Sequence, residues 1–375
     1  MRAILENSIF IAVQIRGIST RKKLTRMFAN MTTKLIFAVL SIAWIAASIG
    51  MTFNNEKSDP RDSDVEVNLD PHQVLGVGSC EKCHAAETGV WKQTPHSKTF
   101  LTLHRKPEAH QIAQKMGIES FKENSACMNC HYTVKNHSAG FEAVAGVSCE
   151  SCHGAAQGWV NVHNDYGGVG ASRDAESAEH RIDRLRASIN GGMRNPVNVY
   201  MVAQSCYRCH TVPDERLVNV GGHKEGSMDF EMVSWSQGMI RHNFLRSNGK
   251  ANEVSSPERL RQLFMAGMIA DLEFSLRATA AATEKATFGI NSAQRASRAA
   301  KRLQAAQAKL NQRLLEEIQT VFSGVKLRLN NAAELTEAAD RIAALGVRFA
   351  ATVKGEDLAA MDAFIPPADH WKNAQ

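Results

Sequence analysis

Residues 146–154 read GVSCESCHG, and residues 149–153 within them form the pattern Cys-x-x-Cys-His. The same pattern occurs three more times, at residues 80–84 (CEKCH), 127–131 (CMNCH) and 206–210 (CYRCH). Together the four copies, numbered here first to fourth along the chain, use all eight cysteines of the sequence. A cysteine pair at this spacing, followed at once by histidine, is typical of covalently attached c-type haem.

Each motif predicts one haem, so the sequence predicts four. Two thiols three positions apart can add to the two vinyl groups on one edge of a porphyrin, and the next residue places an imidazole under the iron. The predicted thioether cysteines are Cys80, Cys83, Cys127, Cys130, Cys149, Cys152, Cys206 and Cys209. The predicted proximal iron ligands are His84, His131, His153 and His210.

Other chemistry is compatible with one such pair. Cys-x-x-Cys also forms half of a zinc site, a thioredoxin-like redox pair or a disulfide. Four pairs, each followed by histidine and with no cysteine left over, favour haem over these alternatives.

The N-terminal part indicates export, which c-type haem requires because this haem is attached outside the cytoplasm. Residues 35–55 hold no charge and follow a basic flank, in agreement with the positive-inside rule. We expect residues 1–55 to be a leader that is either cleaved or kept as an inner-membrane anchor, followed by a linker at 56–70. Whether the leader is cleaved or kept as an anchor, we expect the rest of the chain to lie in the periplasm.

The remaining sequence divides near residue 250. Residues 71–250 are rich in Gly, His and Cys and have only short apolar runs, as expected where haems fill the interior. Residues 251–375 show helical spacing of apolar residues, which predicts helices over 256–283, 291–322, 331–355 and 357–364. Ser256 before Pro257 predicts a cap at the start of the first helix, and Asn331 with Glu334 predicts a capping box at the start of the third. The fold class is therefore mainly α: a haem-packed cytochrome domain with little regular sheet, followed by a C-terminal antiparallel helical bundle.

Ten histidines outside the motifs are candidates for the sixth, distal position on the irons, because neutral imidazole binds iron well. The distal candidates are His96, His163, His223 and His242. The alternative for each is a surface or propionate-bonding role. His104, His110 and His180 are not expected to ligate, whereas a loop after the second motif could bring His137 back over a haem. Methionines rank below histidines, because methionine commonly fills gaps in a core.

The sequence around the motifs resembles that of the tetrahaem cytochrome c-554 family, whose members carry electrons away from hydroxylamine oxidation in ammonia oxidisers. The matching segments are residues 80–103, residues 146–163 and the lone fourth motif, so the resemblance covers about residues 75–245. It implies that His96 serves a haem other than the one attached next to it, and that His163 serves the first haem. It also implies that a histidine after the fourth motif serves the fourth haem, and this could be His223 or His242. It also implies one five-coordinate haem, which here would be the second.

We expect electron transfer between periplasmic or membrane redox partners, with no catalytic residue. One alternative is a haem enzyme with an open sixth position that acts on a small nitrogen or sulfur compound, but no positioned acid, base or clamp residue marks a pocket. Another is a membrane-anchored quinol-oxidising cytochrome. The polar linker before Cys80 argues against it.

Nucleic acid is not expected as a partner. The net charge is +6, but outside the leader the sequence has no cluster of basic residues interleaved with aromatic residues. Membrane association through residues 35–55 and an oligomer formed through the bundle stay open.

Overall fold

The structure is a computed structural model that describes residues 69–138 and 140–372. The predicted leader and all but the last residues of the predicted linker lie outside these ranges. All described residues belong to one compact unit, residues 64–375. Within the described residues no helix is both long enough and apolar enough to cross a bilayer.

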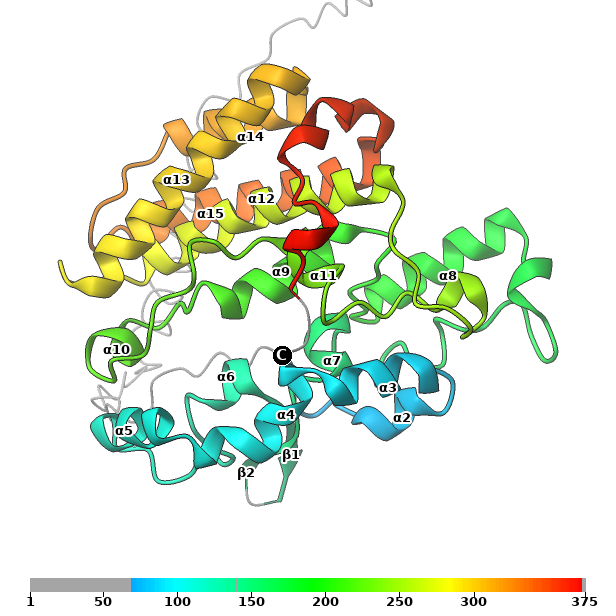
Figure 1. The fold of residues 1–375 in the computed structure, drawn as a ribbon, viewed down its shortest axis with the longest axis horizontal. Coiled ribbons are helices and arrows are strands. Elements are labelled where there is room, and N and C mark those ends of the chain that lie inside the picture. The colour runs from blue at the N-terminus through cyan, green and yellow to red at the C-terminus, as the bar shows by residue number, and fades with distance from the viewer. Residues whose placement is uncertain (1–68, 139, 373–375) are drawn as a thin grey trace, which may run out of the picture. The chain divides into compact units, whose positions relative to one another are not determined.

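The first half of the described chain is built from short helices and one hairpin, coloured blue to green in Figure 1. The strands β1 (Tyr132–His137) and β2 (Gly140–Gly146) pair antiparallel, with an irregularity between Thr133 and Val134. The helices and 3-10 turns are α2 (Val77–Glu81), α3 (Ala85–Gln93), α4 (Pro95–Thr102), η1 (Leu103–Arg105), α5 (Pro107–Met116), α6 (Met128–His131), α7 (Cys149–His153), η2 (Arg173–Ala175), α8 (Ala178–Asn190), α9 (Val199–His210), α10 (Glu215–Asn219), α11 (Met232–Ser236) and η3 (Leu245–Ser247).

Longer helices follow, and the prediction of a mainly α fold is confirmed. They are α12 (Pro257–Ala280), α13 (Thr287–Leu310), α14 (Arg313–Ser323) and α15 (Ala332–Thr352), followed by the 3-10 segments η4 (Glu356–Phe364) and η5 (Ala368–His370). The start of α12 has the predicted cap, because the Ser256 side chain accepts a hydrogen bond from the Arg259 N–H and Pro257 occupies the first turn.

Two details of this helical region differ from the prediction. The single helix expected over 291–322 is two helices, because Asn311 adopts a left-handed conformation (φ 49°) that ends α13. Asparagine tolerates this conformation better than most residues. The capping box expected at Asn331 is also absent: its amide donates to the Glu334 carboxylate at 2.7 Å and to the Lys326 carbonyl oxygen at 3.0 Å, and its side chain accepts no hydrogen bond from a backbone N–H of the first turn.

The main hydrophobic core lies around α12, whose residues 263–276 are all buried. Helices α13 and α15 pack along α12, and α9 packs against the same helix (Figure 1). Since α9 carries the fourth motif, the C-terminal helices share one core with the haem-binding part of the chain. A much smaller cluster, built from Met128, Tyr132, Val134 and Ala143, lies under the hairpin.

Buried polar groups also join α9 to α12. The Glu273 carboxylate accepts hydrogen bonds from the Tyr200 hydroxyl at 2.5 Å and from the Gln204 amide at 3.0 Å, and it pairs with Arg277 at 2.9 Å. Burial and the nearby Glu273 raise the pKa of Tyr200 well above its usual value, so this hydroxyl keeps its proton and remains a donor. The contact fixes the start of the helix that ends in the fourth motif.

At Gly346, α15 approaches α9 closely. A Cβ atom at this position would lie 2.3 Å from Cζ of Tyr200. We expect Gly346→Val to lower the free energy of unfolding by about 1–3 kcal/mol, the usual cost of overpacking a core. Chemical denaturation followed by far-ultraviolet circular dichroism measures it.

Gly324→Ala is the matched control, because its Cβ would meet nothing closer than 3.5 Å and the backbone φ of −78° suits any residue. This control should change the free energy of unfolding by less than about 0.5 kcal/mol. Equal effects of the two substitutions would contradict the close approach of the helices.

Candidate haem sites

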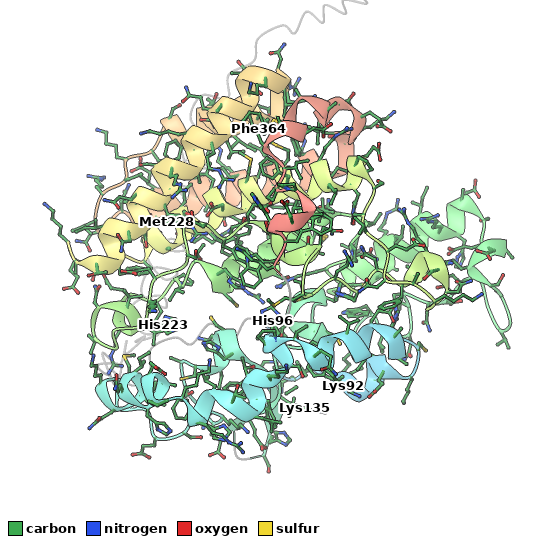
Figure 2. The ribbon with its side chains drawn as sticks, in the orientation of Figure 1. Lys92, His96, Lys135, His223, Met228 and Phe364 are labelled. Atoms are coloured by element: carbon green, nitrogen blue, oxygen red, sulfur yellow. The ribbon has the colours of Figure 1, made fainter. Side chains whose placement is uncertain are left out.

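Each motif histidine faces one other histidine, and the four separations are nearly identical. The pairs, with their distances between ring centroids, are His84–His163 at 6.3 Å, His131–His223 at 6.3 Å, His153–His242 at 6.2 Å and His210–His96 at 6.2 Å. Figure 2 shows His96 and His223 between the lower elements of the view and the helices above them.

This spacing fits an iron ion between the two rings of each pair. Rings this far apart are beyond hydrogen-bond reach of each other, whereas imidazole nitrogens bind first-row metal ions at about 2.0–2.1 Å. Two such bonds place the facing nitrogens about 4 Å apart, and the distance from each nitrogen to its ring centre makes up the rest. The residues present therefore fit a haem iron with two axial imidazoles at each motif.

The structure thus brings all four distal candidates next to a motif histidine. His163 faces the first motif, as the family resemblance implies, and His96 faces the fourth, which is a motif other than the one next to it in the sequence. His223 faces the second motif and His242 the third, so neither lies opposite the fourth motif, where one of them was expected. The second motif, for which the resemblance implies a five-coordinate haem, therefore has a histidine opposite its own. Ligation itself stays a prediction.

Backbone carbonyl oxygens orient three of the four distal candidates through Nδ1. His163 Nδ1 lies 2.8 Å from the Val160 carbonyl oxygen, His223 Nδ1 lies 2.6 Å from that of Lys224, and His242 Nδ1 lies 2.6 Å from that of Ile240. A proton on Nδ1 leaves the Nε2 lone pair for a metal, and such outer contacts are a regular feature of histidine ligands. Local turns therefore hold three distal candidates in the tautomer that ligation needs.

Burial keeps the imidazoles of three motif histidines neutral. Desolvation lowers the pKa of His131 and His153 to about 4 and that of His210 to about 3, with smaller contributions from neighbouring cationic groups. Neutral imidazole is the form that binds iron, so at neutral pH these side chains are ready to ligate.

The remaining described histidines face other partners. His137 lies near Glu142 on the hairpin at 3.6 Å, His110 Nε2 contacts the His104 carbonyl oxygen at 2.7 Å, and His180 pairs with Glu176 at 2.8 Å. In the described residues the loop after the second motif does not fold back to bring His137 opposite a motif histidine.

Cysteines of different motifs lie close together. A hydrogen bond links the thiols of Cys80 and Cys149, raising the pKa of Cys80 and lowering that of Cys149, and Cys130 and Cys209 are linked in the same way. The first motif therefore adjoins the third, and the second adjoins the fourth.

The third and fourth motifs are neighbours as well, through α7 and α9. The Ser205 hydroxyl donates to the Cys152 carbonyl oxygen at 2.8 Å, and Arg208 donates to that of Ser151 at 3.4 Å. A largely apolar cavity lies between these motifs and is lined by cysteines of the second, third and fourth motifs together with His96 and His210. The Phe230 ring stacks on His210 at 4.0 Å and forms one wall.

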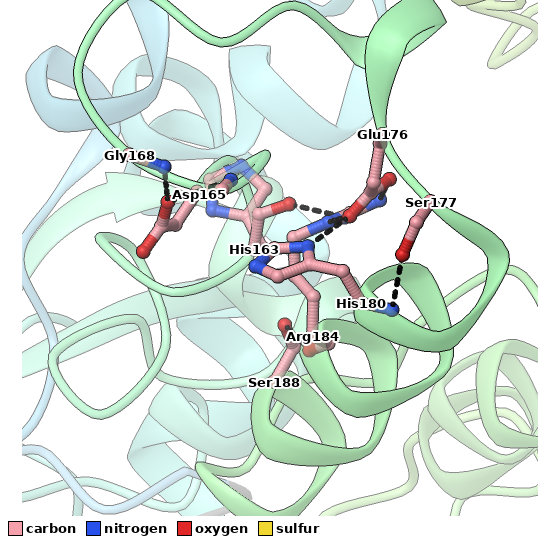
Figure 3. Close-up of polar contacts among 9 residues, drawn as sticks. His163, Asp165, Gly168, Glu176, Ser177, His180, Arg184 and Ser188 are labelled. Carbon is pink, nitrogen blue, oxygen red and sulfur yellow. Dashed lines mark hydrogen bonds and ion pairs between the residues drawn. The ribbon is translucent and has the colours of Figure 1, made fainter.

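Sequence reasoning missed an ion-pair network beside His163 (Figure 3). Arg184 donates to the His163 carbonyl oxygen at 2.6 Å and binds both carboxylate oxygens of Glu176 at 2.6 Å. His180 Nδ1 also lies 2.8 Å from the Glu176 carboxylate. Glu176 immediately precedes the N-cap of α8, and the four-residue spacing of Glu176, His180 and Arg184 was the available signal.

Four motifs with paired histidines define the class of protein, a c-type cytochrome. Residues 79–154, which hold the first three motifs, match the model of the family described as cytochrome c554 and c-prime. The chain is also 30% identical over 100 residues to cytochrome c-554 of Nitrosomonas europaea. That alignment covers 24% of this chain and 43% of the relative. No solved structure matches the chain.

The resemblance to the cytochrome c-554 family is therefore confirmed over the segment that carries the first three motifs. Less than half of the relative's length is matched, and the C-terminal helices lie outside the alignment to the family model. The likeness of this segment to a cytochrome family supports c-type haem at the first three motifs.

The Glu176 contacts predict a pH-dependent effect on stability. Hydrogen bonds from Arg184 and then His180 lower the pKa of Glu176 from 4.5 to about 2. A carboxylate with a lowered pKa in the folded state stabilises that state above the unfolded pKa, and this contribution is lost as the pH falls through the folded pKa. Urea midpoints of the parent protein and Glu176→Gln should therefore differ most near neutral pH and converge as the pH falls from 4.5 toward 2.

Asp183→Asn provides the control, because Asp183 lies next to Arg184 on α8 and its pair with Arg186 is exposed. Its effect should be small at every pH. A Glu176→Gln difference that stays constant from pH 7 to 3 would show that the charge of Glu176 contributes nothing.

Proposed function

We propose that this chain is a periplasmic tetrahaem c-type cytochrome that carries electrons between two redox partners. The observation that carries the proposal is the set of four histidine pairs, each containing one motif histidine and each 6.2–6.3 Å apart. When bound, haem supplies reversible one-electron chemistry at its iron. The polypeptide holds the haems, fixes their axial ligands and adjusts their potentials through burial and charge.

The pairing at the second motif favours a carrier over an enzyme. A haem that binds a small substrate needs an open sixth position, and His223 lies opposite His131 at the same distance as in the other pairs. The turn at Gly221 and Gly222 supports this placement: Gly222 has a φ of 76°, and a Cβ at Gly221 would lie 2.5 Å from the Leu217 carbonyl oxygen. The backbone that presents His223 is thus tightly constrained.

Contacts between motifs support a linear electron path that does not follow the order of the sequence. The first motif adjoins the third through Cys80 and Cys149, the third adjoins the fourth through Ser205 and Cys152, and the fourth adjoins the second through Cys209 and Cys130. We therefore infer the order first, third, fourth, second. The haems attached at Cys80 and Cys127 would be the two ends, where partners exchange electrons.

The C-terminal helices act in this proposal as a scaffold for the fourth haem. They bury α9 against α12 and α15, and Glu273 binds Tyr200 and Gln204 of the same helix. Export through residues 1–55 would place the assembly in the periplasm, and its donor and acceptor would be periplasmic or membrane redox proteins.

Spectra of the purified protein test the proposal. The oxidised protein should be entirely low-spin by optical and electron paramagnetic resonance spectroscopy, and carbon monoxide should leave the reduced protein unchanged. In His223→Ala one haem of four should become high-spin and bind carbon monoxide, because the iron above His131 then lacks its second imidazole.

His137→Ala is the control, since His137 lies on the hairpin and faces Glu142. Its spectra should equal those of the parent. A high-spin fraction that binds carbon monoxide in the parent protein would instead favour the haem enzyme.

A further inference from the structure

Arg194, in the loop between α8 and α9, contacts the third motif and also Ser205, the residue that precedes the fourth motif. Its N–H donates to the His153 carbonyl oxygen at 2.8 Å, and its own carbonyl oxygen lies 3.4 Å from His153 Nδ1. Its guanidinium donates to the Ser205 hydroxyl at 2.8 Å, and that hydroxyl donates to the Cys152 carbonyl oxygen. One residue thus orients the proximal histidine of the third motif and extends its charge toward the fourth.

The loop that carries Arg194 packs closely against the segment that follows the third motif. A Cβ atom at Gly154 would lie 2.2 Å from the Gly192 carbonyl oxygen, and one at Gly158 would lie 2.6 Å from that of Gly191. The backbones of residues 154–158 and 191–192 therefore pack directly against each other. This contact fixes where the Arg194 side chain begins.

The guanidinium is a fixed charge close to the third and fourth motifs. The Ser205 hydroxyl that it contacts at 2.8 Å donates to the Cys152 carbonyl oxygen at 2.8 Å, and the charge of Arg194 acts electrostatically on Cys152 and Cys209. Loss of water and the nearby Arg208 lower the pKa of Arg194 to about 10, so it is still protonated at neutral pH. Among the described residues it forms no ion pair with a carboxylate, so no neighbouring anion of that kind cancels its charge.

We propose that Arg194 is a positioning residue that raises the reduction potentials of the third and fourth haems, by holding a positive charge beside their attachment at Cys152 and Cys209. Reduction adds one negative charge to a haem, and a nearby cation in a partly dry site stabilises the reduced form. The inference rests on the proposed function. In the inferred order of haems, it makes the two middle sites better electron acceptors than they would be without this residue.

Spectroelectrochemical titration of the loaded protein tests the proposal. In Arg194→Gln two of the four potentials should fall, each by at least a tenfold change in the reduction equilibrium, which equals 59 mV for one electron. The other two should stay near their parent values. Arg194→Lys keeps the charge and should retain most of the potential, which a purely structural role would not predict.

Arg259→Gln is the matched control. Burial, with a smaller contribution from the charge of Arg246, lowers the pKa of Arg259 to about 10 as well, but its guanidinium donates to the Pro196 carbonyl oxygen. This variant should leave all four potentials in place. Unchanged potentials in Arg194→Gln, or equal losses in the Gln and Lys variants, would overturn the proposal.

Ser205→Ala keeps the proposal testable if Arg194→Gln fails to mature. It removes the hydroxyl that holds the guanidinium, and it should lower the same two potentials by a smaller amount. Four unchanged potentials in that variant would also overturn the proposal. A parent protein without haem would instead refute the proposed function, so the two failures are distinguishable.

Discussion

The separation of 6.2–6.3 Å between paired histidine rings is the constraint on which the rest of the structure depends. Each pair joins segments that lie far apart in the sequence, such as His96 on α4 and His210 at the end of α9. The hairpin side of the unit has only a small cluster of buried apolar residues. Large macrocycles held between the rings would supply the packing that side chains do not provide there.

Local chemistry made much of this molecule predictable. The haem-binding motifs could be predicted because covalent attachment and proximal ligation need residues within five positions of one another. The C-terminal helices could be predicted because their apolar residues repeat with the helical period. The break at Asn311 was missed because one left-handed residue leaves that period almost unchanged on either side. The hairpin of β1 and β2 also had no clear signal, since its strands are only partly buried.

Tertiary features were less accessible. Histidine chemistry and the family resemblance selected the four distal candidates, but only the folded chain pairs His223 with the second motif and His242 with the third. The supporting residues Arg184 and Arg194 were missed altogether, because a lone arginine in a sequence does not reveal which carbonyl or thiol it will meet. The same holds for the use of the C-terminal helices: periodicity predicts that they bury a face, and the structure shows α9 among their partners.

The central claim is that four haems are attached to the eight cysteines and lie between these histidine pairs. Intact-mass spectrometry of protein produced with a c-type maturation system tests it most directly. The account predicts a mass that exceeds that of the polypeptide by four haems and that persists after denaturation, since thioether bonds survive unfolding. A mass equal to that of the bare polypeptide, or to that of a chain carrying fewer haems, would contradict it.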